Sequence, residues 1–251
     1  MSAVPGRGAA FLRLFLLQGA WTYERMHGIG MAFAAEPLLR GAFGGDEPRR
    51  RAALARAAEC FNCHPVLAGV ALGASVRAEA DGVPPEQIRR LKAALQGPLG
   101  ALGDRFFWAG VVPALAAAGV ILAALGLPLA GVVVLVLGYG VVRVRAQQWA
   151  LEAGLAEGMG VSARLAGSWL PRWATAVAGP AAFVVGLAVP LAARALVGAL
   201  PAPAHGVALG AFVAAALLVW RRPADCPPIR VALVGGALLL AALLLWPGGA
   251  A

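Results

Sequence analysis

Residues 106–142 read FFWAGVVPALAAAGVILAALGLPLAGVVVLVLGYGVV and contain no charged side chain. A membrane-spanning helix needs about 20 mostly apolar residues, so this stretch is long enough for two short passes. Gly126, Leu127 and Pro128 interrupt it near its middle, and glycine and proline so close together are typical of a turn. The stretch therefore predicts a helical hairpin that crosses a membrane twice.

Further apolar runs follow towards the C-terminus. Residues 173–193 and 231–251 carry no charge, and residues 195–220 carry only His205 as a possible charge. Each run is long enough for one pass, and Pro201-Ala202-Pro203 marks a break between the third and fourth passes. We therefore expect about five hydrophobic passes, several of them broken by proline or glycine.

The overall composition points to the same class of protein. The chain is 61% hydrophobic and 13% charged, whereas soluble domains average about 45–50% apolar and about 25% charged residues. A soluble fold of this length would have to expose part of that apolar surface to water. The sequence predicts an all-α integral membrane protein.

The formal net charge of +9 comes almost entirely from arginine. Arg143 and Arg145 follow the predicted hairpin and Arg221 and Arg222 follow the fourth pass, while the opposite turns and the C-terminal tail lack Lys and Arg; only Arg194 departs from this pattern. Positive residues favour the cytoplasmic side. We therefore expect a cytoplasmic N-terminus, a C-terminus outside, and no nucleic acid partner.

The chain divides into two parts by composition. Residues 1–105 alternate apolar and charged stretches, which favours amphipathic and re-entrant helices, and residues 106–251 form the transmembrane part with a cytoplasmic or interfacial helical segment near 143–172. Within the first part we expect helical spacing over 11–28, charged helices over 47–59 and 84–94, a short apolar helix over 64–76, and a bend or broken helix over the glycine-rich stretch 96–104. Asp46 is the expected N-cap of the helix over 47–59, with Pro48 in its first turn.

Cys60 and Cys63 have the spacing of a redox or zinc motif, but no second pair accompanies them, and His64 is adjacent rather than spaced as a ligand. A membrane enzyme that uses these cysteines is the weakest of the hypotheses. We identify no catalytic residue, and we expect neither a metal nor a cofactor.

Three ordered motifs stand out from generic membrane sequence: WTYERM at residues 21–26, FNCHP at residues 61–65, and QGPLGALGD at residues 96–104. Their order and separation resemble the IID subunits of the mannose/fructose/sorbose-type sugar phosphotransferase system (PTS) permeases. The resemblance runs from about residue 18 to 145 and continues weakly to the end. The chain departs from the family pattern at Thr22, Cys63, the pair Gly100-Ala101 and Arg105, and it is shorter after Arg145.

The resemblance implies a permease subunit of the bacterial inner membrane. With a IIC subunit it would form the translocation path for a hexose of the mannose type, which is phosphorylated on uptake by separate IIA and IIB phosphocarrier subunits. A trimer of IIC–IID heterodimers in the lipid bilayer is the implied assembly. The alternative, motivated by Arg105 and by the shortened C-terminal region, is a regulatory or sensor protein of a PTS that moves no sugar.

A sugar ring needs amide, carboxylate and imidazole partners for its hydroxyls. We therefore expect Asn62, His64, Gln96 and Asp104 to contact the substrate. The alternatives are helix capping for Asn62 and His64, and a cap or an ion pair with Arg105 for Asp104. Other motif residues are expected to have a structural role: Tyr23, Glu24, Arg25, Pro65, Gly97, Pro98, Gly100 and Gly103. Among them, we expect Glu24 and Arg25 to form an ion pair on an amphipathic helix.

Overall fold

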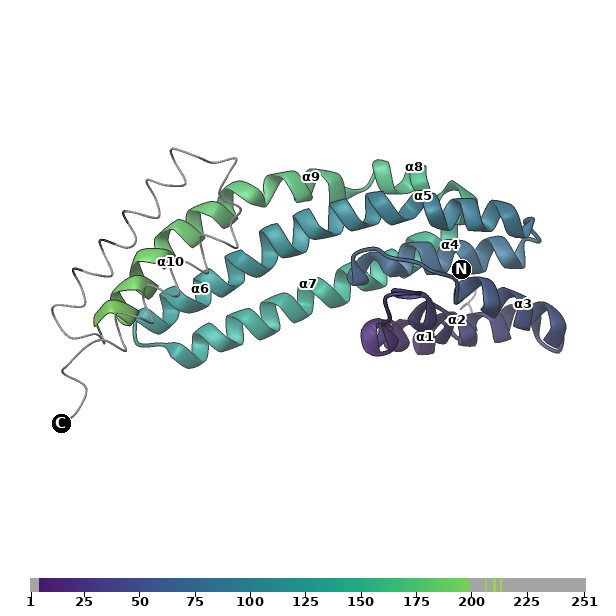
Figure 1. Ribbon diagram of the computed structural model, residues 1–251, viewed down its shortest axis with the longest axis horizontal. Helices are drawn as coiled ribbons and strands as arrows, with labels where there is room; N and C mark the ends of the chain where they lie inside the picture. Colours follow the sequence, from purple (N-terminus) through teal and green to yellow (C-terminus); the bar gives the residue numbers. More distant parts are fainter. Residues whose placement is uncertain (1–4, 199–205, 207–209, 211–212, 214–251) are drawn as a thin grey trace.

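The structure is a computed structural model that describes residues 5–198 together with residues 206, 210 and 213. The described part is helical and elongated (Figure 1), and within it two isolated bridges are the only β-type pairing. Its main helices are α1 (Arg7–Leu14), α2 (Gly28–Phe43), α3 (Glu47–Ala57), α4 (Ala68–Ala80), α5 (Pro85–Gly103), α6 (Val112–Ala124), α7 (Pro128–Glu157), α8 (Val161–Ala166), α9 (Trp169–Ala176) and α10 (Ala178–Gly198). Shorter helical turns are η1 (Leu17–Ala20), η2 (Pro65–Leu67), the π-helix η3 (Asp104–Val111) and η4 (Gly158–Gly160).

The predicted hairpin is confirmed. Helix α6 ends at Ala124, α7 begins at Pro128, and Gly126 adopts a φ of 84° in the turn between them, a conformation that glycine reaches without steric cost. Two helical stretches, Pro85–Ala124 and Pro128–Val189, are long and apolar enough to cross a membrane. In Figure 1, α7 runs antiparallel to the continuous α5–η3–α6 helix, and α8, α9 and α10 follow the opposite side of that helix.

The third predicted pass, residues 173–193, falls on α9 and α10, and α10 packs beside α6. The segment 143–172 is helical as expected, but its first half is the continuation of α7, which runs without interruption to Glu157. The fourth and fifth passes and the break at Pro201-Ala202-Pro203 lie outside the described residues.

Local signals in the N-terminal part are also confirmed. Asp46 caps α3, since its carboxylate accepts a hydrogen bond from the backbone N–H of Arg49 at 3.1 Å, and Pro48 lies in the first turn. The short apolar helix after His64 is α4, which is buried along most of its length between α2, α5 and α7. A helix N-cap and an apolar run each depend on residues that are close together in the chain, so both can be predicted from the sequence.

Helical spacing over 11–28 was a wrong prediction for the second half of that stretch. Helix α1 ends at Leu14, and after one turn of η1 the backbone of Trp21 is extended. The segment that follows donates and accepts backbone hydrogen bonds with Phe61 instead of forming its own helix. Long-range pairing has overridden the local pattern.

The break expected over 96–104 was also wrong. Helix α5 continues through Pro98 to Gly103, and the helical ladder widens only afterwards, into the π-helix that begins at Asp104. Pro98 removes one backbone donor, but the packing of α5 against α4 holds the helix together. The irregularity therefore lies one turn later than the glycines suggested.

Helices α4 and α7 cross closely because glycine lines the crossing. A Cβ on Gly73 would lie 2.6 Å from the backbone nitrogen of Leu155, and a Cβ on Gly154 would lie 2.3 Å from the carbonyl oxygen of Val70. Small residues that let two backbones approach are typical of helix packing in membranes. This crossing anchors the transmembrane hairpin to the N-terminal part.

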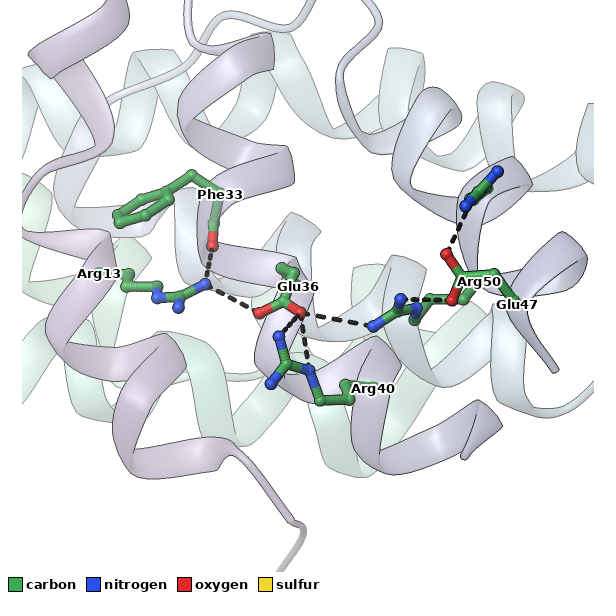
Figure 2. A network of polar contacts seen from close by, with 7 residues as sticks. Arg13, Phe33, Glu36, Arg40, Glu47 and Arg50 are labelled. Atoms are coloured by element: carbon green, nitrogen blue, oxygen red, sulfur yellow. Dashed lines mark hydrogen bonds and ion pairs between the residues drawn. The ribbon is translucent and has the colours of Figure 1, made fainter. Parts of the chain in front are cut away.

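A polar network ties α1, α2 and α3 together (Figure 2). Glu36 of α2 pairs with Arg13 of α1 at 3.1 Å, with Arg40 at 2.5 Å, and with Arg50 of α3 at 3.7 Å, and Arg50 also pairs with Glu47. Although burial raises the pKa of Glu36, the hydrogen bonds from Arg40 and Arg13 bring it below its usual value. The network fixes the N-terminal helices as a unit.

Candidate functional site

The first two sequence motifs lie side by side through backbone hydrogen bonds. The N–H of His27 donates to the carbonyl of Phe61 at 2.8 Å, and the N–H of Phe61 donates to the carbonyl of Arg25 at 3.3 Å. Between these bonds Met26 adopts a φ of 51°, an uncommon value for a residue other than glycine. The bonds hold residues 25–27 against the loop that leads into α4.

The second and third motifs are also joined. The backbone N–H of Asn62 donates to Oε1 of Gln96 on α5 at 3.0 Å. Pro65 then begins η2, and the chain continues into α4, as expected for a helix start with proline in its first turn. The loop of residues 60–64, which carries most of the second motif, therefore contacts both the first and the third motif.

A cavity of about 510 Å³ lies where the three motifs meet. All four residues expected to contact substrate line it, and they come from the 60–64 loop, from α5 and from the start of η3. The full lining is Gln18, Trp21, His27, Asn62, Cys63, His64, Pro65, Gln96, Gly97, Gly100, Ala101, Asp104 and Trp108. The structure brings the predicted set together across residues that are far apart in the sequence.

His64 lies on the most enclosed side of the lining. Its side chain is 2% exposed, and its ring stacks on Phe107 with centroids 4.7 Å apart and planes 10° apart. Trp108 packs at 5.1 Å from the same ring, and Gly103 approaches so closely that a Cβ there would be 2.2 Å from the Cβ of His64. The orientation of the imidazole is fixed by packing.

The ring of His64 is held neutral. Burial, the positive charge of Arg143 and the nearby His27 lower its pKa to about 4. Both ring nitrogens are buried, and neither has a hydrogen-bond partner among the described residues. Buried polar atoms in native proteins are nearly always paired. The two nitrogens of this imidazole, one a donor and one an acceptor, thus have unused hydrogen-bonding capacity beside the cavity.

Asp104 and Cys63 provide the other reactive groups of the lining. Asp104 is exposed, and within the described part of the chain it forms no ion pair, so the alternative of a pairing with Arg105 is not observed. Cys63 is buried, and burial followed by the negative charge of Asp104 raises the pKa of its thiol. Its Sγ donates to the carbonyl of His64 at 3.3 Å, so the group is a protonated thiol.

Several motif residues do not reach the cavity. Tyr23 is 85% exposed, and its ring packs against Trp21. The predicted ion pair of Glu24 with Arg25 was wrong: these residues lie in a turn rather than on a helix, and the guanidinium of Arg25 donates to the carbonyl of Ala58 at 3.4 Å. Pro98 and Gly103 belong to α5 but not to the lining.

Sequence reasoning missed an entire wall of the cavity. Gln18, Trp21 and His27 line it from the segment between α1 and α2, and Trp108 lines it from η3. The available signal was proximity, because Trp21 is the first residue of the WTYERM motif and His27 directly follows it.

The cysteine motif does not assemble a metal site in the part of the chain that the structure describes. Cys60 is exposed and Cys63 is buried, so the two thiols have different surroundings. No group of three His, Cys, Asp or Glu side chains with metal-binding geometry occurs among the described residues. Carboxylate, amide and imidazole groups around a polar cavity suit the binding of hydroxyls instead.

Comparison with known proteins agrees with the motifs. The model of the PTS system mannose/fructose/sorbose family IID component matches residues 7–196. The mannose-specific EIID component of Escherichia coli K12 is 30% identical over 184 residues, which cover 71% of this chain and 65% of that protein. The fructose permease IID component of Bacillus subtilis 168 is 29% identical, with 71% and 66% covered. The chain thus spans about two thirds of the length of these relatives.

Solved structures show the same architecture. A cryo-EM structure of the mannose transporter ManYZ in complex with microcin E492 matches with a TM-score of 0.57 and 29% identity, covering 72% of this chain and 68% of that one. A second membrane protein structure matches with a TM-score of 0.65 and 28% identity over the same shares. The all-α integral membrane architecture predicted from the sequence is confirmed, and the chain belongs to the IID components of the mannose/fructose/sorbose family of the phosphotransferase system.

Proposed function

We propose that this chain is a permease subunit that binds a hexose of the mannose type and, with a IIC subunit, forms its path across the membrane. The observation that carries the proposal is the cavity in which both nitrogens of His64 lie buried without a partner. Family membership supplies the reaction context, in which the sugar is phosphorylated on uptake. The proposal assigns sugar contact to Asn62, His64, Gln96 and Asp104.

The lining offers the groups that a sugar needs. Neutral His64 supplies one donor and one acceptor, the carboxylate of Asp104 accepts, and the side chain of Asn62 does both. The side-chain carbonyl oxygen of Gln96 accepts a hydrogen bond from the backbone N–H of Asn62, and its NH₂ group remains able to donate to a sugar. Trp108 is 51% exposed beside this set and provides an aromatic face for the apolar side of a ring.

The charge of the lining favours a neutral sugar over its phosphate. The lining contains no Lys or Arg, and the low pKa of His64 and the lowered pKa of His27 keep both imidazoles uncharged. A phosphate group would meet the carboxyl group of Asp104 and no cationic side chain of the lining, which is unfavourable at short range. The product of phosphorylation would therefore leave the cavity.

The proposed orientation places the arginine-rich end of the molecule in the cytoplasm. The apolar part of α7 runs from the turn at Gly126 to Arg143, and Arg145 follows on the same side. In this arrangement residues 1–105 form the part that carries the site, and residues 106–251 form the transmembrane part. The N-terminus is cytoplasmic and the C-terminus lies outside the bacterial inner membrane.

The proposed assembly contains a IIC subunit, IIA and IIB phosphocarriers and the lipid bilayer, arranged as a trimer of IIC–IID heterodimers. The exposed apolar face of α7, which includes Leu129, Val132, Val136 and Leu137, is available to lipid or to the IIC subunit. The phosphoryl group would come from the separate carriers, because the cavity imidazoles of this chain are buried.

The regulatory alternative is not favoured. It was motivated in part by Arg105, but that residue is exposed and is not among the residues that line the cavity. The cavity therefore keeps its full set of expected hydroxyl-binding groups. Accumulation of sugar phosphate in a strain that carries only this system would exclude the alternative.

The direct test is binding of radiolabelled mannose to this chain co-purified with its IIC partner. His64→Ala and Asp104→Asn are each expected to weaken binding at least about tenfold, the loss that follows from one to two hydrogen bonds. Asp81→Asn is the matched control, because Asp81 is an exposed carboxylate at the end of α4 that pairs with Arg77 outside the cavity. Unchanged binding in both cavity variants would remove the site assignment.

A further inference from the structure

The cavity has a second wall that none of the expected ligand residues belongs to. Gln18, Trp21 and His27 line it from the segment between α1 and α2. The backbone bond from His27 to Phe61 and the bond from Met26 to Thr22, at 2.7 Å, hold this segment in place. Backbone hydrogen bonds therefore fix the position of this segment, and its side chains are not needed to hold it there.

The imidazole of His27 is the least explained group of this wall. Its side chain is 3% exposed, and its Nδ1 is buried without a hydrogen-bond partner in the described part of the chain. Burial lowers the pKa of His27, so the ring is neutral at physiological pH. A neutral imidazole brings one donor and one acceptor, and leaving them unpaired in a buried place is costly.

A purely structural role does not account for this side chain. His27 occupies the N-cap position of α2, where a side chain would normally accept a hydrogen bond from the first turn, but its imidazole makes no capping bond. It also joins no metal-binding group among the described residues. The backbone N–H alone performs the structural task, through its bond to Phe61.

His27 and His64 belong to the same site. Both line the same cavity, and both are almost fully buried, at 3% and 2% exposure. Together they carry three buried ring nitrogens without partners. Two neutral imidazoles in one polar cavity are suited to neighbouring hydroxyls of a single sugar ring, each of which needs both a donor and an acceptor.

We propose that His27 is a sugar-binding residue, which completes the site from the N-terminal segment and bonds a different hydroxyl from the one that His64 bonds. Trp21, which is 41% exposed on the same wall, packs against the apolar face of the ring. The inference rests on the proposed function, because it takes a hexose as the occupant. It makes the segment 18–27, rather than only the 60–64 loop and α5, a determinant of which sugar is accepted.

The test uses the full chain co-purified with its IIC partner in detergent, with radiolabelled mannose and a series of monodeoxy mannoses. His27→Leu keeps most of the side-chain volume and removes both hydrogen-bonding groups, and it is expected to weaken mannose binding about tenfold. The decisive readout is the analogue series: one deoxy sugar, lacking the hydroxyl that His27 bonds, should bind the variant as well as it binds the unaltered chain. Glu24→Gln is the matched control from the same segment, since Glu24 is exposed and lies outside the lining.

Two further variants keep the test decisive if His27→Leu does not fold. His27→Gln retains a donor and an acceptor and should keep mannose affinity within about threefold, whereas the shorter His27→Asn should lose about tenfold. Equal affinities in all three variants, or a uniform loss across every deoxy sugar, would overturn the role of His27. If His64→Gln abolishes binding while the His27 variants do not, this inference alone fails; if the unaltered complex binds no mannose, the proposed function fails and the inference falls with it.

Discussion

Gly103 and Gly100 lie on the same helix three residues apart, but the structure predicts opposite effects for the same substitution. A Cβ on Gly103 would be 2.2 Å from the Cβ and 2.4 Å from the Cγ of His64, whereas a Cβ on Gly100 would meet nothing within 4 Å. Carbon atoms in contact normally lie about 3.5–4.0 Å apart. The Cβ of His64 cannot rotate away, and its ring is stacked on Phe107.

The magnitude follows from two opposing contributions to the free energy of unfolding. Replacing glycine by alanine inside a helix stabilises it by about 1 kcal/mol, and this gain is common to both positions. Overpacking costs about 1–3 kcal/mol, and we expect the upper end at Gly103 because backbone-attached atoms collide. Gly100→Ala should therefore gain about 1 kcal/mol and Gly103→Ala should lose about 2 kcal/mol.

The assay is thermal unfolding of the full chain in detergent micelles, followed by tryptophan fluorescence. A difference of about 3 kcal/mol corresponds to a gap of about 6–12 °C between the two variants, at about 2–4 °C per kcal/mol for a chain of this size. Mannose binding should be lost by Gly103→Ala, because this substitution displaces His64. A Gly103→Ala protein that melts at or above Gly100→Ala would refute the proposed packing around His64.

Three other outcomes can be checked with the same melting assay. Gly73→Val should destabilise the α4–α7 crossing by at least about 3 kcal/mol, while Gly8→Val in α1, where a Cβ meets nothing within 4 Å, should change stability little; equal effects would contradict the close crossing. Glu79→Gln should cost about 3–5 kcal/mol because it breaks the bidentate pair between the buried carboxylate of Glu79 and the partly buried Arg56, and Glu86→Gln, at an exposed pair, should cost less than about 1 kcal/mol. The pKa of His64 is about 4 in the folded chain and 6.5 for the free side chain, which represents the unfolded state. As the pH falls, the unfolded state therefore binds the proton first. The contribution of His64 to stability should be complete above pH 6.5 and should fall towards pH 4 by about 1.4 kcal/mol per pH unit. His64→Gln should flatten that slope, and an unchanged slope in this variant would exclude His64 as its source.

The departures from the family pattern now have structural positions. Cys63, where the family has threonine, lines the cavity as a buried thiol next to His64, so it changes the polarity of the lining. Gly100 and Ala101 both line the same cavity, and their reversed order exchanges a methyl group between neighbouring positions. Arg105 lies outside it. Of these three departures, Cys63 and the pair Gly100-Ala101 lie in the cavity lining, and Arg105 does not.

Predictions from sequence succeeded where the physical cause is local. The cap at Asp46 and the turn at Gly126 depend on a few neighbouring residues, and both are confirmed. Asn62, His64, Gln96 and Asp104 were chosen for their chemistry and their motifs, and the structure places all four around one cavity. Their role in sugar binding stays a prediction until the variants are measured.

Predictions failed where distant segments compete with local pattern. The helix expected to continue through residue 28 ends early because residues 25–27 pair with Phe61. The helix expected to break near Gly97 continues because its packing against α4 outweighs the cost of Pro98 and the glycines. Neither interaction partner is adjacent in the sequence, so no local window contains it.

The sequence by itself determined that this chain is a helical membrane protein and which family it belongs to. Long uncharged runs and ordered motifs are one-dimensional properties, and they persist whatever the chain packs against. Only the tertiary structure decided that Trp21 and His27 share a cavity with His64 and Asp104, and that Gly103 is closed against a side chain while Gly100 is open. Those facts depend on how helices cross and on which atoms then meet, and the spacing of residues along the chain does not contain that information.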